Sequence, residues 1–361
     1  MTKKKKTLMI VLLSIGSVIT TVLGAFGGFI IYATATTLDE PGIRDVEVKG
    51  KNTKTLSEDE VVKIMSWNIG YASLDEKWDF YMDGGKHSIG ESKENTLNNV
   101  AAMKEKINEN DPDIMFIQEI DVNSHRSFNV NQLVSFRETY SEDKYQNTFA
   151  RNFKAGYIPI PLGDPLGGVE SGIGIFSKYP VTSAKRHQLP IPFSWPINLF
   201  NLKRCLLVNR TPIEGSDKEL VTINLHLEAY TEEEGKTKQL KQLMQVMQEE
   251  YDKGNYVIAG GDFNQTFSTT NHEKYPKISD WVCPVIDATQ YPDFDFRMDD
   301  TYPTCRCLDG PYIGRDKDIQ QYWMIDGFIT SKNVNVQSLE TVNYNFKNTD
   351  HNPVVMTFKL S

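Results

Sequence analysis

The sequence has few cysteines, and their spacing does not mark a cysteine-based scaffold. It contains four, Cys205, Cys283, Cys305 and Cys307, among 361 residues, which is too few for a disulfide framework in a chain this long. Cys305 and Cys307 lack the two-residue gap of a zinc knuckle, and no Cys/His partner pair stands nearby. Two states stay open: one bridge from Cys283 to Cys305 or Cys307, or buried free thiols.

Positive charge is scarce outside the N-terminus. The formal net charge is −9, and residues 1–32 carry only four lysines, which leaves −9 − 4 = −13 on the rest of the chain. A body this acidic has no overall field for gathering nucleic acid, although a local basic groove or bound divalent cations could supply one. Such a groove would have to be assembled from Lys154, Lys185, Arg186, Lys203 and Arg204. The sequence also lacks internal repeats and low-complexity tracts.

The N-terminus carries one long apolar run. Lys3 to Lys6 precede an uncharged stretch with an apolar core at residues 8–32. This core is longer than the about 20 residues that a helix needs to span a bilayer. We expect the lysines to stay cytoplasmic, which places the body outside a cell membrane that the chain crosses once. Secretion after signal cleavage is the alternative, because residues 33–35 (Ala-Thr-Ala) have the small-x-small form of a cleavage site. We favour an uncleaved anchor, since the apolar run is longer than a usual signal-peptide core.

Three regions follow from this pattern: residues 1–37 as cytoplasmic lysines and transmembrane anchor, residues 38–60 as a polar linker, and residues 61–361 as one domain. Buried strands are predicted at residues 61–67, 114–117, 171–177, 205–210, 220–227, 256–259, 322–330 and 354–359, and helices at 91–110, 131–140 and 232–251. Residues 154–168 and 265–321 are expected to be loops. Many buried strands with few helices between them indicate packed sheets covered by helices.

A set of polar residues stands at or just past the ends of these strands: Asn68, Glu119, His226, Asp262, Asn264, Asp326, Asp350 and His351. After the strand at 256–259, Gly260 and Gly261 are expected to break the strand and turn the backbone. Asp262 and Asn264 then follow two residues apart, a spacing that puts side chains on one side of an extended segment. Each residue alone has a structural explanation, such as a turn, a cap or a satisfied core histidine.

Together these residue types suit hydrolysis of a phosphodiester. Mg²⁺ needs only one or two carboxylates plus waters to neutralise the charge of the ester. A carboxylate can activate water opposite the leaving group, and a histidine held by an aspartate can donate to a developing oxyanion.

The polar residues lie within a series of seven short motifs, which occur in this order: MSWNIG (65–70), FIQEID (116–121), SGIGIFSKYP (171–180), INLHL (223–227), GGDFN (260–264), IDGFITS (325–331) and DHNPV (350–354). With them the chain resembles the endonuclease/exonuclease/phosphatase superfamily of metal-dependent phosphoesterases over about residues 61–359. It is similar in particular to membrane-anchored bacterial members. The resemblance implies an α/β fold, a four-layer α/β/β/α sandwich of two packed mixed sheets.

The resemblance also implies a role for each residue. Metal binding falls to Glu119 as principal carboxylate, with Asn68 and Asp350 nearby. Asp262 is implied to orient or deprotonate the attacking water, and Asn264 to bind the phosphate. His351 is implied to donate to a phosphoryl oxygen and Asp326 to orient it, while His226 contacts the phosphate or assists the leaving group. The cofactor is expected to be Mg²⁺, with Mn²⁺ as an alternative and one or two ions bound.

The substrate is the least determined part. The acidic body and the anchor favour a lipid head group or a small diester over nucleic acid, with an exported DNA or RNA nuclease and a non-catalytic anchored binding module as alternatives. The apolar segment from Pro190 to Pro196 is expected to pack on the body rather than dip into lipid. The sequence does not indicate the oligomeric state.

Overall fold

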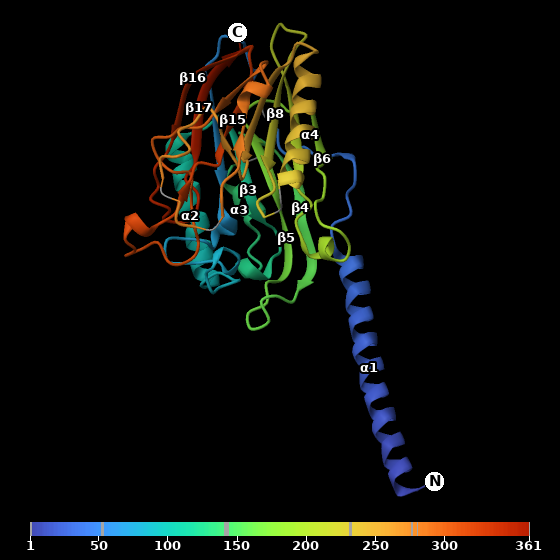
Figure 1. Cartoon of the computed structure of the whole chain (residues 1–361). Coiled ribbons are helices and arrows are strands. Elements are labelled where there is room, and N and C mark those ends of the chain that lie inside the picture. The colour runs from blue at the N-terminus through green and yellow to red at the C-terminus, as the bar shows by residue number, and fades with distance from the viewer. Residues whose placement is uncertain are drawn as a thin grey trace.

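The computed structural model describes residues 2–51, 54–140, 144–230, 233–275, 277–279 and 281–360. Two mixed sheets pack face to face, with helices on their outer faces, and a long helix projects from one end of the body (Figure 1). The helices are α1 (Lys3–Thr36), α2 (Lys93–Asn110), α3 (Gln132–Thr139) and α4 (Glu233–Tyr251). The predicted four-layer sandwich is confirmed.

One sheet has seven strands in the order β1-β6-β7-β8-β9-β15-β12. Their bounds are β1 (Ile43–Asp45), β6 (Ser183–Gln188), β7 (Cys205–Pro212), β8 (Glu219–His226), β9 (Tyr256–Asp262), β15 (Asp326–Ser331) and β12 (Phe294–Arg297). Only β8 and β9 run parallel to each other; the other neighbours are antiparallel. Its outer face buries the apolar stripe of α4, including Leu243 and Met247.

The other sheet has six strands in the order β16-β17-β2-β3-β5-β4. Their bounds are β16 (Val334–Thr341), β17 (Val354–Leu360), β2 (Val62–Asn68), β3 (Ile114–Asp121), β5 (Gly167–Ser177) and β4 (Gln146–Ile158). α2 and α3 cover its outer face. Apolar residues of both inner faces, among them Phe116 and Phe328, form the central core. Burial of this apolar surface is the main force that holds the two sheets together.

Short elements complete the described chain. Two small sheets pair β10 (Thr266–Phe267) with β11 (Val285–Ile286) and β13 (Cys305–Arg306) with β14 (Tyr322–Trp323). The 3₁₀ turns are η1 (Gly70–Ala72), η2 (Tyr81–Asp83), η3 (His125–Ser127), η4 (Ile197–Phe200), η5 (Ala288–Gln290) and η6 (Lys317–Ile319). The four cysteines are free thiols.

Several predicted elements differ from the structure. Residues 154–168 were expected to be a loop, but β4 extends to Ile158 and β5 begins at Gly167, because the two strands pair along their length as a hairpin. The segment at 265–321 contributes β12 to the large sheet. The predicted strand at 322–330 is divided into β14 and β15. Predicted helix residue 232 lies outside the described residues.

The predicted linker, residues 38–60, packs on the body. Its β1 pairs with β6 at the edge of the large sheet. Leu38 and Leu56 are buried, and Leu56 belongs to the central core. The connection from α1 to the domain is therefore held in place by sheet pairing and by apolar contacts.

α1 is long and apolar enough to cross a membrane, and a signal sequence would have the same character. Most of the helix is exposed, but its last turns dock on the body. The ring of Phe29 stacks on that of Phe200 at 5.7 Å between centroids, and Gly156 donates its backbone N–H to Thr36 Oγ1 at 3.2 Å. Figure 1 shows α1 leaving the body at the end where the turn between β4 and β5 also lies.

Gly260 and Gly261 continue β9 instead of ending it, which corrects the prediction that they break the strand. Glycine is required at both positions because the neighbouring strands leave no space for a Cβ atom. A Cβ on Gly260 would lie 2.4 Å from the Phe328 ring, and one on Gly261 would lie 2.0 Å from the Leu225 carbonyl oxygen. Gly261 also has a φ of +144°, which L side chains rarely adopt.

We therefore expect Gly261→Ala to destabilise the fold strongly, by about 3 kcal/mol or more, because β8 or β9 must move to admit the methyl group. The measurement is the thermal unfolding midpoint of the full chain. Gly215→Ala is the matched control, since Gly215 also has a positive φ but has nothing within 4 Å of an added Cβ. Equal losses in the two variants would show that backbone conformation alone, rather than crowding, requires glycine at 261.

Candidate active site

Strand register brings three predicted site residues into one row on the large sheet. His226 at the end of β8 lies opposite Asp262 at the end of β9, and Asp262 lies opposite Asp326 at the start of β15. On the other sheet, Asn68 at the end of β2 lies opposite Gln118 of β3. Each sheet therefore delivers half of the polar set, and the halves meet where the sheets pack together.

Glu119 reaches this edge through a β-bulge. The pairing of β3 with β5 shifts register between Ile117 and Ile120, and Glu119 has a φ of +58°. A bulge of this kind turns one side chain away from the regular alternation, and strained backbone of this type clusters at functional sites. The sequence predicted a strand ending at Ile117, whereas the strand continues through the bulge to Asp121.

Asp262 and Asn264 are held together by a turn. The backbone N–H of Asn264 donates to Asp262 Oδ1 at 2.8 Å, and Asn264 has a φ of +50°. The side-chain Nδ2 of Asn264 donates to the Leu227 carbonyl at 2.9 Å. The two residues do share the site, but an Asx-type turn places them, and the alternation of an extended strand does not.

The Asn68 side chain connects carboxylates of both sheets. Its Nδ2 donates to Glu119 Oε1 at 3.2 Å and to Asp262 Oδ2 at 3.0 Å, and its Oδ1 accepts the backbone N–H of Gly70 at 3.0 Å. Both amide atoms are thus in use, and Asn68 fixes the spacing between the two acids.

His351 is oriented by Asp326. Its Nδ1 lies 2.8 Å from Asp326 Oδ2, so a proton on Nδ1 is donated to that carboxylate. The other ring nitrogen, Nε2, lies 3.8 Å from Asp262 Oδ2 and 3.8 Å from Asp350 Oδ2. Burial opposes the charged imidazolium, but the carboxylates of Asp326 and Asp350 outweigh it and raise the pKa of His351 well above its ordinary value. The charged form of the His351 ring is therefore favoured in the folded protein.

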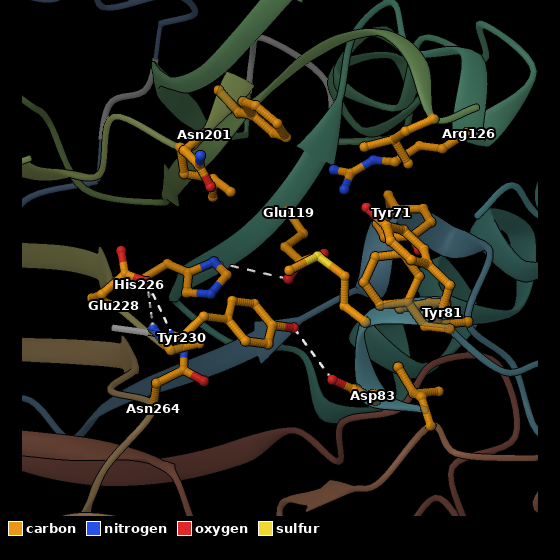
Figure 2. Close-up of a pocket in the computed structure, with 18 of the residues that line it drawn as sticks. Tyr71, Tyr81, Asp83, Glu119, Arg126, Asn201, His226, Glu228, Tyr230 and Asn264 are labelled. Atoms are coloured by element: carbon orange, nitrogen blue, oxygen red, sulfur yellow. Dashed lines mark hydrogen bonds and ion pairs between the residues drawn. The ribbon is translucent and has the colours of Figure 1, made fainter. Parts of the chain in front are cut away.

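His226 has the opposite electrostatic character. Burial, the Arg204 guanidinium and His351 lower the pKa of His226 well below its ordinary value, so the ring is neutral. Its Nε2 lies 3.5 Å from Asp262 Oδ2, and its Nδ1 lies 3.9 Å from Glu119 Oε1 without a hydrogen bond to any described residue. Figure 2 shows the ring turned toward Glu119. A buried ring nitrogen without a partner is available to a bound ligand.

These residues border a cleft of about 1020 Å³. Six of the eight predicted site residues line it: Glu119, His226, Asp262, Asn264, Asp350 and His351. Asn68 and Asp326 do not line the cleft and are buried behind these residues. Burial and the neighbouring Asp326 raise the pKa of Asp262 above its ordinary value, which makes its carboxylate a better base.

From the sequence, the loops at 82–87, 154–168, 190–200 and 293–318 are expected to shape the substrate pocket, and each contributes lining residues, Asp83 among them. Tyr71, Arg126 and Tyr230 also line the cleft and were not identified from the sequence. Arg126 binds both oxygens of Asp121 and lies over the Tyr71 ring, 3.8 Å from its centroid. Across the cleft, Tyr230 Oη donates to Asp83 Oδ1 at 3.4 Å, and Figure 2 shows the two side chains pointing toward each other. Arg126 and Tyr230 lie in loops that carry no motif, so no pattern in the sequence identifies them.

The donor set fits a divalent cation. Burial and the charge of Asp350 raise the pKa of Glu119 above its ordinary value, although Arg126 counteracts this. Carboxylate and amide oxygens are the ligands that Mg²⁺ and Mn²⁺ prefer. Ligand atoms of Asp262, Asp326 and His351 also converge within 4.8 Å of one another, as do those of Cys305, Asp350 and His351. Six acids line the cleft against three arginines, so a bound cation would reduce the remaining repulsion among the carboxylates.

Two packed sheets with acids and histidines at one edge define a phosphoesterase fold of the α/β/β/α class. The model of the endonuclease/exonuclease/phosphatase family matches residues 65–343, and the chain belongs to this family. Its members hydrolyse phosphoesters and generally depend on a divalent metal ion. The expectation of a metal-dependent phosphoester hydrolase is confirmed at this level.

Solved structures support the fold. A family protein from Beutenbergia cavernae DSM 12333 is 16% identical with a TM-score of 0.57, over 83% of this chain and 72% of that one. The human nocturnin catalytic domain with a bound sulfate anion is 17% identical with a TM-score of 0.52, over 88% and 98%. A family protein from Leptotrichia buccalis C-1013-b is 14% identical with a TM-score of 0.52, over 82% and 99%. A search of curated proteins found no significant match.

We expect Glu119→Gln to weaken binding of Mg²⁺ by at least about tenfold, because the variant removes a negative charge from the cleft without changing its shape. Isothermal calorimetry with the full chain measures the affinity. Glu340→Gln, at an exposed position of β16, is the control and should bind as the wild type does. Equal Mg²⁺ affinity in Glu119→Gln and wild type would exclude Glu119 as a ligand.

Proposed function

We propose that the chain is a membrane-anchored phosphodiesterase that uses Mg²⁺ or Mn²⁺ and works outside the membrane. The observation that carries the proposal is the meeting of Asp262, a carboxylate with a raised pKa, and the Asp326–His351 pair in one cleft. The first supplies a base and the second a charged proton donor. Hydrolysis of a phosphodiester needs both, because water must lose a proton while negative charge grows on the phosphoryl oxygens.

The residues divide the reaction as follows. Asp262 takes a proton from the attacking water, whose oxygen forms a bond to phosphorus. His351, held through Nδ1 by Asp326, donates from Nε2 to a phosphoryl oxygen. The bond from phosphorus to the leaving oxygen breaks, and that oxygen takes up a proton from solvent. Neutral His226, whose Nδ1 has no hydrogen-bond partner among the described residues, is placed to contact the phosphate. Asn264 is positioned to contact the phosphate. Glu119 and Asp350 would hold the metal, with Asn68 positioning the Glu119 carboxylate, and the bound metal would neutralise the charge of the ester.

The charge distribution favours a small or lipid phosphodiester over nucleic acid. Three of the five cations from which a DNA-binding groove would have to be assembled are engaged inside the body, whereas Lys154 and Lys185 are exposed. Arg186 is buried against Glu40, and Arg204 is buried against Glu228. Lys203 donates to the Leu38 carbonyl. Two exposed lysines are few for the phosphate-tracking surface that gives nucleases their affinity. This supports the preference derived from the net charge of −13.

For activity, we expect Asp326→Asn and His351→Ala each to slow hydrolysis of bis(4-nitrophenyl) phosphate by about 10²–10³-fold. The double variant should be hardly slower than either, since Asp326 acts only through His351. The readout is 4-nitrophenolate release with Mg²⁺ and the full chain. His87→Ala is the control, because His87 also lies 2.8 Å from an aspartate, Asp79, but outside the cleft.

Additive losses would refute the orienting role of Asp326. Failure of the wild type to hydrolyse the diester with either metal would refute the phosphodiesterase and favour an anchored binding module. Cleavage of DNA that falls steeply with salt would favour the nuclease instead.

For topology, we propose that α1 crosses the membrane with Lys3–Lys6 inside and the body outside. Protease added to intact cells should remove the body and leave a short membrane-bound fragment, while a cytoplasmic marker stays whole. A body that survives, or that is recovered in the culture medium after cleavage near residue 35, would contradict the anchor.

A further inference from the structure

The cleft has two chemically different parts. The catalytic part carries the carboxylates and histidines described above. The other part is an apolar wall built from three separate segments: Phe26 and Phe29 of α1, Ile158 and Ile160 at the end of β4, and Ile197 and Phe200 of η4. No residue of this wall has a role in phosphodiester hydrolysis, so its apolar character needs another explanation.

The anchor helix itself supplies part of this wall. α1 has 34 residues, which at 1.5 Å per residue is about 51 Å, whereas the hydrocarbon core of a bilayer is about 30 Å thick. If the helix enters the core just after Lys6, about 20 residues fill it, and Phe26 and Phe29 then lie at the outer boundary. The stacking of Phe29 on Phe200 fixes the body at that level. The cleft therefore opens where outer-leaflet lipids have their head groups and upper acyl chains.

Exposed apolar side chains also lie close in sequence to the lining residues Ile160 and Pro196. Leu162 in the β4–β5 turn is 91% exposed, and Trp195 is 64% exposed. The segment from Pro190 to Pro196, which is expected from the sequence to pack on the body, does so in part: Pro190, Pro192, Phe193 and Pro196 are half-buried, and Ile191, Ser194 and Trp195 are exposed. Tryptophan is enriched at membrane interfaces, and a cluster of exposed apolar residues beside an anchor is typical of a membrane-contacting surface.

We propose that the cleft binds a lipid phosphodiester, with the phosphate at the catalytic residues and the upper part of one acyl chain along the apolar wall. This inference rests on the proposed phosphodiesterase activity and names its substrate class. The apolar wall and the catalytic residues line one continuous cleft, so a ligand that fills it must carry both a phosphate and an alkyl chain. An amphipathic phosphoester has both groups. The anchor thus serves as one side of the substrate site as well as a tether.

The test compares diesters that share a reacting bond and differ in the tail: methyl, hexyl and dodecyl 4-nitrophenyl phosphate. The full chain is held in amphipol, and each ester is kept below its micelle concentration. Water adds to phosphorus and 4-nitrophenolate leaves in every case. We expect kcat/KM to rise at least about 100-fold from methyl to hexyl, since each buried methylene contributes up to about fourfold in binding.

A double variant locates the tail. Ile160→Glu with Ile197→Glu places charge on the wall at positions that are 52% and 56% exposed, so folding should be little affected. We expect the hexyl-to-methyl ratio of kcat/KM to fall at least about tenfold. Ile313→Glu with Ile319→Glu is the matched control, at 55% and 54% exposure away from the cleft, and should keep the wild-type ratio.

The outcomes separate the two proposals. Hydrolysis of the methyl ester with no dependence on tail length would overturn the lipid site and leave the phosphodiesterase standing. The same loss of ratio in both double variants would also overturn it, because added charge anywhere would then have the effect. No hydrolysis of any ester, together with no tail-dependent binding of dodecyl phosphate to the Asp262→Asn variant, would overturn both.

Discussion

The hydrogen bonds of Asn68 across the sheet interface are the interaction on which the site depends. Its amide nitrogen donates to Glu119 of its own sheet and to Asp262 of the other sheet. Two buried carboxylates repel each other, and the amide offsets part of that cost while it fixes their separation. Nearby, Gln118 donates to Asn224 across the same interface at 2.8 Å. The apolar core brings the sheets together, and these polar contacts decide how their edges align.

The two histidines differ because their surroundings differ. His351 faces three carboxylates and keeps its proton, whereas His226 lies beside Arg204 and other cations and loses it. The same cleft therefore holds a charged imidazolium, His351, and a neutral imidazole, His226. Acid–base chemistry at one phosphorus uses two groups in different protonation states. The backbone contributes as well, since Glu119 and Asn264 both adopt positive φ angles where their side chains enter the site.

The site lies beside the end of α1, so the proposed anchor would hold the cleft at the membrane surface. The strand ends that carry the catalytic residues and the last turns of α1 border one cleft at one end of the body. A tether that ended elsewhere on the sandwich would present the cleft to solvent instead. The packed segment between α1 and β2, with β1 paired to β6, keeps this orientation from being lost through a loose connection.

The sequence by itself determined the family, the two-sheet class and most core strands and helices, because short motifs and hydrophobic periodicity are local properties of the chain. It also identified eight polar residues that the fold brings to one edge, although their individual roles stay predictions. Only the tertiary structure decided that Gly260 and Gly261 continue a strand, that a bulge directs Glu119 into the site, and that Arg126 and Tyr230 line the cleft. Those features depend on contacts between strands and loops far apart in the sequence, such as the crowding of Gly261 by Leu225, and no local pattern records them.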